Sequence, residues 1–194
     1  MRQGRKIVFG VFGAMVLSGC AGPSHNGFLT FPAPAKVLYA EAGNPQKVDS
    51  FMVGDGGPEI IAIVDPDCIF CHKFYEQVMP LVSAGKLRVR FVVASFLKPS
   101  SEPRAAAILS ARDPAQALAQ NEAGFNDGTE EGGIAQDQHP AFAVMADVRK
   151  NNRFLSSTGE VATPTLIFAT RDGGYRVMHG TPQDMAGFLG NLRE

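Results

Sequence analysis

Short runs of consecutive apolar residues recur along the chain and predict buried β-strands. The clearest run is Glu59–Val64, which is rich in β-branched residues and has turn residues on both sides. Leu87–Ala94 is a second run of this kind. Thr165–Ala169 and Tyr175–Met178 are two more, and the turn Arg171–Gly174 between them is typical of a hairpin.

Helical spacing follows the first of these strands. One apolar face is formed by residues that recur at intervals of three or four: Phe70, Phe74, Val78 and Leu81. Asp67 is the predicted N-cap of this helix, and Pro80 is expected to kink it or to end it early. The succession of strand, helix and strand over residues 59–94 predicts a βαβ unit.

The middle of the chain is predicted to be helical with one long loop. Residues 102–120 are rich in alanine, and Asp113-Pro114 marks the start of a second helix within them. Residues 124–138 hold glycines and acids with little apolar content, so we expect a loop there. Residues 140–154 are expected to form another helix.

A final helix is predicted at the C-terminal end, with Thr181 as N-cap, Pro182 at N1 and Asp184 at N3. The order of elements is then a βαβ unit, a helical insert and a ββα unit. This order resembles the thioredoxin-like fold. The sequence therefore predicts an α/β domain of that fold, with a helical insertion, over residues 49–194.

The composition is that of a folded domain, and the net charge argues against nucleic acid as a partner. The 194 residues are 45% hydrophobic and 19% charged, which is normal for a globular protein and allows one domain of ordinary size. The formal net charge is −1. Because there is no basic surplus, we do not expect nucleic acid as a partner.

The N-terminal residues have the pattern of an export signal. A positive segment with Arg2 and Arg5 precedes the short apolar run Ile7–Leu17, which is too short to span a bilayer comfortably. The run ends in Leu17-Ser18-Gly19-Cys20, which resembles the lipobox of bacterial lipoproteins. That resemblance implies removal of residues 1–19 and lipid on Cys20. A plain secretory signal with a chance cysteine is the weaker alternative.

The expected location follows from this reading. Ala21 after the lipidated cysteine implies, by resemblance to lipoprotein sorting, the periplasm with an anchor in the inner leaflet of the outer membrane. Residues 20–48 contain several prolines and are interpreted as a tether with some extended structure.

The cysteine count favours redox chemistry. With Cys20 used for lipid, the remaining two of the three cysteines are Cys68 and Cys71. A disulfide across two intervening residues closes a very short loop and stabilises little by chain entropy. A redox-active pair in a C-x-x-C motif is therefore the better interpretation.

The position of the motif assigns a role to each thiol. Cys68 stands where the helix should begin, and the partial positive charge of a helix N-terminus favours its thiolate, which is the attacking form. Cys71, one turn later, is the predicted resolving thiol. His72, if protonated, would add positive charge near Cys68, while Asp65 and Asp67 would oppose it.

Thr163-Pro164 is the second candidate feature. The other Thr-Pro pair is explained by helix capping, whereas Thr163-Pro164 precedes a strand without such a role. The residues alone favour an ordinary trans proline, since only about 5–6% of X–Pro bonds in folded proteins are cis.

The chain resembles the DsbC/DsbG thiol:disulfide interchange proteins, and the DsbG branch more closely. The resemblance covers about residues 49–194 and rests on short motifs in the right order: Val64–Cys68, Cys71, Ser83–Leu87, Lys98-Pro99, Ala105–Leu109, Asp113–Ala115 and Thr163-Pro164. It implies that Cys68 and Cys71 exchange disulfides and that Thr163 and a cis Pro164 bind the substrate chain.

The resemblance also implies partners and two departures. Exported proteins with cysteines would be the substrates, an inner-membrane electron donor of DsbD type would keep the pair reduced, and no cofactor or metal is needed. About 28 residues between Cys20 and Asp49 are too few for the family's N-terminal dimerisation domain. We therefore expect a monomer with reduced isomerase activity. The Ile69-Phe70 dipeptide also departs from the family's usual residues, so its redox potential is not carried over.

Three alternatives remain at this point. Residues 68–72 read C-x-x-C-H, a c-type haem attachment pattern, although the buried strand before them argues against haem. Zinc is weaker, because no second ligand pair with suitable spacing exists. The third alternative is a lipoprotein that binds a partner through a thioredoxin-like domain with a static disulfide.

Overall fold

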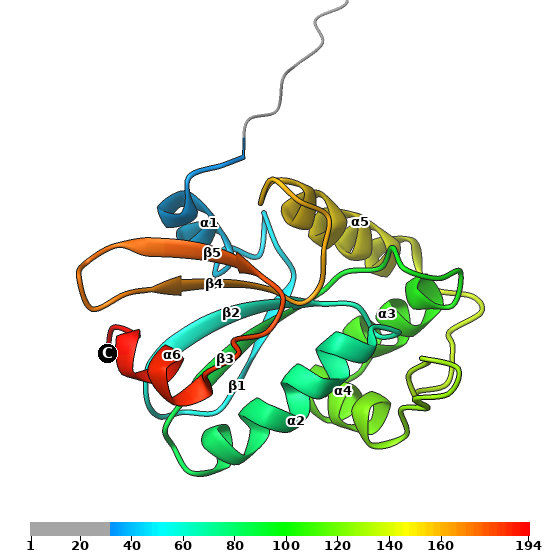
Figure 1. Cartoon of the computed structure of the whole chain (residues 1–194). Coiled ribbons are helices and arrows are strands. Elements are labelled where there is room, and N and C mark those ends of the chain that lie inside the picture. Colours follow the sequence, from blue (N-terminus) through cyan, green and yellow to red (C-terminus); the bar gives the residue numbers. More distant parts are fainter. Residues whose placement is uncertain (1–31) are drawn as a thin grey trace, which may run out of the picture.

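The structure is a computed structural model that describes residues 32–194. A five-stranded sheet in the order β1-β3-β2-β4-β5 has helices on both faces (Figure 1). The strands are β1 (Ser50–Val53), β2 (Glu59–Val64), β3 (Arg88–Val93), β4 (Thr165–Ala169) and β5 (Tyr175–His179). The helices are α1 (Ala35–Glu41), α2 (Ile69–Ser83), α3 (Ser101–Ser110), α4 (Pro114–Ala123), α5 (Phe142–Ser156) and α6 (Met185–Asn191).

β2 lies at the centre of the sheet. It pairs parallel with β3, where Ile61 is opposite Arg90, and antiparallel with β4, where Ile61 is opposite Ile167. Residues 60–64 are all buried. Because both faces of β2 are covered, its sequence is a continuous apolar run rather than an alternating one. The chain thus leaves the carboxyl end of β2 in the middle of the sheet, and the cysteines follow there.

Different helices cover the two faces of the sheet. On one face Ile60 and Ala62 pack in the same cluster as Phe74 of α2, together with residues of α3, α4 and α6. On the other face Ile61 packs with Leu38 of α1 and with the last turns of α5. The predicted α/β fold with a helical insertion is confirmed, and α3, α4 and α5 form the insertion between β3 and β4.

Two elements near the start of the described residues, α1 and β1, were not predicted. Residues 35–41, expected to be tether, form α1, whose Leu38 is fully buried, and Val48 is also buried. Contact with the sheet accounts for this helix, because seven residues form no stable helix alone. β1 was not predicted, since its four residues Ser50–Val53 are all half-buried and show no alternation. The folded domain therefore begins before residue 49.

The helix ends also correct three predictions. Cys68, and not Asp67, is the N-cap of α2. The helix does not end at Pro80 but runs to Ser83, because the proline removes one N–H bond while its carbonyl still accepts from Ala84 at 3.1 Å. α6 begins after Asp184, whose side chain caps it, so Thr181 is not the N-cap.

Within residues 32–194, no helix combines the length and the apolar character needed to cross a membrane. The predicted signal peptide and Cys20 lie outside the described residues.

Candidate active site

Cys68 and Cys71 lie at the junction of β2 and α2, at the centre of the sheet. Cys68 has an extended backbone conformation, as an N-cap residue requires, and its Sγ accepts a hydrogen bond of 3.2 Å from the Cys71 N–H. Both thiols are free and buried, with Cys68 4% and Cys71 2% exposed. Phe70 between them is 60% exposed, so the turn presents an aromatic ring to solvent beside a nearly covered sulfur.

The two thiols differ in acidity. The pKa of Cys68 is lowered from 9.0 to about 7, mainly by its hydrogen bond with the Cys71 thiol and further by the Thr163 side chain and by the backbone N–H groups of Cys71 and Phe70. Burial works against this lowering. The pKa of Cys71 is raised well above 9.0 by burial and by its contacts with Cys68. One sulfur of the pair therefore ionises near neutral pH and the other stays protonated.

Thr163 lies against the first cysteine although it is 95 residues away in the chain. The Cys68 thiol donates to the Thr163 carbonyl at 3.3 Å, and the Thr163–Pro164 peptide bond is cis. Thr165 then starts β4, the neighbour of β2. The sheet pairing of β4 with β2 is what brings this segment to the start of α2.

Asp65 is buried beneath the turn that carries the cysteines. Its carboxylate accepts from the N–H groups of Asp67, Phe96 and Leu97 at 2.9, 2.8 and 3.1 Å, and from the Ser101 hydroxyl at 2.7 Å. Burial raises its pKa, while these bonds oppose the rise. Asp65 therefore fixes the turn to the segment that leads from β3 into α3.

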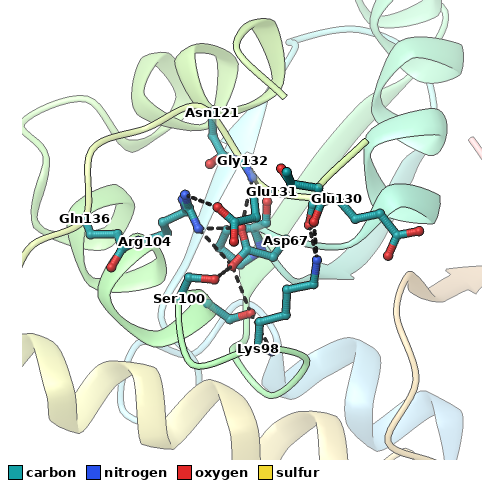
Figure 2. Close-up of polar contacts among 12 residues, drawn as sticks. Asp67, Lys98, Ser100, Arg104, Asn121, Glu130, Glu131, Gly132 and Gln136 are labelled. Carbon is teal, nitrogen blue, oxygen red and sulfur yellow. Dashed lines mark hydrogen bonds and ion pairs between the residues drawn. The ribbon is translucent and has the colours of Figure 1, made fainter. Parts of the chain in front are cut away.

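Asp67, directly before Cys68, is the centre of a second buried network (Figure 2). Its carboxylate accepts from Arg104 Nη1 at 2.9 and 3.1 Å, from the Ser100 hydroxyl at 2.6 Å and from the Gly132 N–H at 2.9 Å. The network joins the turn, the start of α3 and the loop after α4. The negative charge of Asp67 is thus in direct contact with the positive charge of Arg104.

The His72 ring contacts Glu122 and Phe125. Its Nδ1 lies 2.9 Å from a carboxylate oxygen of Glu122, and the ring stacks on Phe125 with centroids 4.5 Å apart. Burial raises the pKa of Glu122, while the bond to His72 opposes the rise. The main influences on the Cys68 pKa are Cys71 and Thr163, whereas Asp65, Asp67 and His72 are engaged with other groups.

Two hollows share Phe70 and Thr163 in their walls, and Cys68 lines one of them. One, of about 320 Å³, is lined by apolar Ile69 and Leu97 and by the charged residues Lys98 and Glu130, besides Cys68 and Asp67. The other, of about 390 Å³, is lined by Glu160, Ala162, His179, Gly180 and Thr181. The exposed Phe70 ring thus stands between two depressions into which side chains of a bound peptide could fit.

Sequence reasoning missed several residues of this site. Arg104, Glu122 and Gly132 all come from the helical insertion, far in sequence from the cysteines. The available signal was Arg104, a cation directly before the apolar run Ala105–Leu109. No group of three or more metal-ligating side chains occurs among the described residues.

The chain is similar to known thiol:disulfide interchange proteins. No family model matches the chain. Thiol:disulfide interchange protein DsbG of Pseudomonas aeruginosa is 29% identical over 192 residues, which cover 93% of this chain and 72% of that protein. The protein of the same name from Escherichia coli is 30% identical over 160 residues, 76% of this chain, and the match spans 60% of its own length.

Solved structures are similar in fold. A periplasmic thioredoxin-like protein of Salmonella enterica serovar Typhimurium has a TM-score of 0.60 at 19% identity, covering 79% of this chain and 93% of that one. The catalytic domain of Proteus mirabilis ScsC has a TM-score of 0.61 at 16% identity, covering 81% and 96%. The fold is thioredoxin-like. The chain is a homologue of the DsbG thiol:disulfide interchange proteins, as the sequence motifs predicted.

Proposed function

We propose that the chain exchanges disulfides, or reduces oxidised cysteines, in exported proteins through Cys68 and Cys71. The observation that carries the proposal is the position of Cys68 as the N-cap of α2, with its sulfur 3.2 Å from the Cys71 N–H and 3.3 Å from the Thr163 carbonyl. The contact with the Cys71 thiol lowers the pKa of Cys68 to about 7, whereas burial raises the pKa of Cys71. At neutral pH such a pair offers one thiolate for attack and keeps the second thiol protonated until the first has reacted.

The reaction proceeds in two exchanges. The Cys68 thiolate attacks one sulfur of a substrate disulfide, which forms a Cys68–substrate disulfide and releases the other substrate sulfur as a thiolate. Cys71 then loses its proton and attacks the Cys68 sulfur, which releases the second substrate thiolate and leaves a Cys68–Cys71 disulfide. Two electrons pass from the pair to the substrate, and the proton of Cys71 goes to a released thiolate or to water.

The groups around Cys68 support a role for Thr163 and Pro164 in substrate binding. The Thr163 carbonyl already accepts a bond from the Cys68 thiol at 3.3 Å, so a substrate chain that approaches the sulfur meets this backbone. The two hollows beside Phe70 would take side chains on either side of the substrate cysteine. Backbone contacts combined with apolar depressions suit many sequences, as an exchange enzyme for varied proteins needs.

The location and the electron source belong to the same proposal. We propose a periplasmic protein, held by lipid on Cys20 at the inner leaflet of the outer membrane. An inner-membrane donor of DsbD type would return electrons to the Cys68–Cys71 disulfide. We expect a monomer. Thiol alkylation in intact cells tests the electron source: the pair should be found reduced, and should become oxidised when the donor is deleted.

Trapping of mixed disulfides tests the roles of the two thiols. Cys71→Ser should accumulate a disulfide between Cys68 and a scrambled test protein, because attack proceeds but resolution fails. Cys68→Ser should form none, and Cys20→Ser is the control that removes the proposed lipid-bearing cysteine and leaves the Cys68–Cys71 pair intact. Trapping that persists in Cys68→Ser, or a wild-type protein that never exchanges with glutathione, would contradict the proposal.

A further inference from the structure

The ion pair of Asp67 and Arg104 is unusual in its burial and in its position. Arg104 is 9% exposed and Asp67 is 0% exposed as side chains, so the pair is shielded from water. Asp67 is the residue directly before the proposed nucleophile. Burial of two charges is costly unless they compensate each other, so the pairing has a strong physical reason to persist.

The charge of Asp67 matters because the neighbouring sulfur must become negative. A full unpaired charge within about 10 Å, in a medium of effective dielectric constant near 20, shifts a pKa by about one unit. A lone carboxylate at residue 67 would therefore favour the protonated Cys68 thiol. The guanidinium of Arg104, with two bonds to this carboxylate, cancels most of that effect.

The other charged groups near the turn are matched separately. The Asp65 carboxylate is held by three backbone N–H groups and Ser101. The Lys98 ammonium donates to the carbonyls of Thr129 and Glu130 at 2.6 and 2.7 Å. Arg104 Nη2 reaches Glu131 at 3.1 Å, but that carboxylate is 41% exposed and screened by water. Arg104 is thus the cation in direct contact with Asp67.

Arg104 also connects the turn to the loop that forms the wall of the 320 Å³ hollow. Gly132 donates to the Asp67 carboxylate from this loop, and Glu131 beside it binds Arg104 (Figure 2). Glu130, on the wall of the hollow, has a φ of 50°, a left-handed conformation that costs a non-glycine residue free energy. The contacts of Lys98, Asp67 and Arg104 on either side hold it in place.

We infer that Arg104 is a positioning residue for disulfide exchange: it neutralises Asp67 beside the nucleophile Cys68 and fixes the turn and the loop around it. The inference rests on the proposed function. It assigns to the helical insertion a direct influence on the reactivity of the cysteine. Replacement of Arg104 should therefore change how exchange depends on pH, in addition to any loss of stability.

The test measures the pKa of Cys68 by the pH dependence of iodoacetamide alkylation in the reduced, full-length protein, with the adduct on Cys68 located by peptide mass spectrometry. Arg104→Gln should raise this pKa by about one unit. Asp67→Asn should lower it, because Arg104 then loses its nearest negative partner. The double variant Asp67→Asn/Arg104→Gln should return close to wild type. Arg90→Gln is the matched control, since Arg90 binds Glu59 at 2.8 Å at the far end of β2.

Exchange rates give a second readout that a merely structural role would not move. A higher pKa leaves less thiolate at low pH but a more nucleophilic thiolate at high pH. Arg104→Gln should therefore exchange with oxidised glutathione roughly threefold more slowly than wild type at pH 6 and roughly threefold faster at pH 9. Arg90→Gln should match wild type at both pH values.

The outcomes separate the two proposals. A wild-type protein that exchanges, with a Cys68 pKa that is the same in Asp67→Asn and Arg104→Gln, overturns the role of Arg104 alone. Equal shifts in Arg104→Gln and Arg90→Gln overturn it as well. If Arg104→Gln does not fold, Asp67→Asn and the double variant still decide, because the inference requires a lower pKa in the first and near-recovery in the second. A wild-type protein without exchange overturns the proposed function instead.

Discussion

The two ends of β2 each have a carboxylate bound by arginine, but the two pairs are built differently. Where the strand begins, Glu59 binds Arg88 and Arg90 of β3 at 3.5 and 2.8 Å, and these arginine side chains are 38% and 25% exposed. Beyond the other end, Asp67 binds Arg104 in nearly complete burial. Glu59 is opposite Arg88 in the parallel ladder, whereas Arg104 comes from the insertion.

This difference separates a replaceable contact from a required one. Water can solvate the arginines beside Glu59 if the pair is broken, so removal of one partner costs little free energy of unfolding. Water cannot replace Arg104 around Asp67. The end of the strand that leads to the proposed reactive cysteines therefore has the contact whose loss costs more free energy, and the insertion supplies it.

Removal of the arginine from each end should give the largest contrast. Arg104→Ala leaves a buried carboxylate unpaired and should lower the free energy of unfolding by about 3–5 kcal/mol. Arg90→Ala should lower it by about 1 kcal/mol or less. Denaturant unfolding of the reduced proteins measures both. Equal losses would mean that the burial of the two pairs does not distinguish them.

The cysteines that follow β2 should also make the free energy of unfolding depend on pH, which the Glu59 end should not do. The pKa of Cys68 is lowered from 9.0 to about 7. The Cys68 thiolate therefore adds to the free energy of unfolding above about pH 9, and this added stability is lost as the pH falls through 7. The reduced protein should gain at most about 3 kcal/mol between pH 6 and 9. Above pH 9 the raised pKa of Cys71 reverses the trend, because its thiol ionises more readily in the unfolded chain.

Unfolding of reduced wild type and Cys68→Ala at several pH values measures this gain. The rise between pH 6 and 9 should disappear in the variant. A rise that survives in Cys68→Ala would have to come from groups outside the cysteine pair.

One glycine near each end of β2 has no room for a side chain. A Cβ at Gly132 would overlap the buried Asn121 side chain, which bonds the Pro66 carbonyl beneath the cysteine turn. A Cβ at Gly57 would overlap the backbone of residues 86–87 near the other end. Gly132→Ala and Gly57→Ala should each cost about 1–3 kcal/mol. Only Gly132→Ala should alter the rate of Cys68 alkylation, and the same change in both would contradict this division.

The smallest effect is expected from the outer member of the Asp67 network. Glu131 is 41% exposed, so Glu131→Gln should change the free energy of unfolding by about 0.5 kcal/mol or less. The Cys68 pKa should stay within about 0.2 units of wild type, since the charge of Glu131 is screened. A shift as large as that of Arg104→Gln would move the source of the effect from Asp67 to Glu131.

The sequence predicted the elements whose signals are local. The run at Glu59–Val64, the helix start at Asp113-Pro114 and the cysteine spacing all have their physical cause within a few neighbouring residues. Asp113 indeed caps α4, and its side chain accepts from the Gln116 N–H at 3.0 Å. The hairpin turn at residues 171–174 was predicted for the same reason.

Elements that depend on distant contacts were missed. α1 exists because Leu38 is buried against the sheet, and no capping side chain in the sequence announces it. Arg104 joins Asp67 across 37 residues, and neither residue belongs to a periodic pattern that relates it to the other. The position of the Asp67 network could therefore be seen only once the insertion was folded onto the turn.

One contact at the start of α2 links the chemistry to the backbone. The Cys68 sulfur, which we propose attacks the substrate, is also the atom that caps the helix, through the Cys71 N–H at 3.2 Å. A sulfur in a mixed disulfide carries no charge and accepts this bond more weakly than a thiolate does. The first helical turn is therefore expected to loosen when substrate is attached and to tighten when the pair is reduced. The amide proton of Cys71 thus serves as a built-in reporter, whose NMR shift follows each stage of the catalytic cycle.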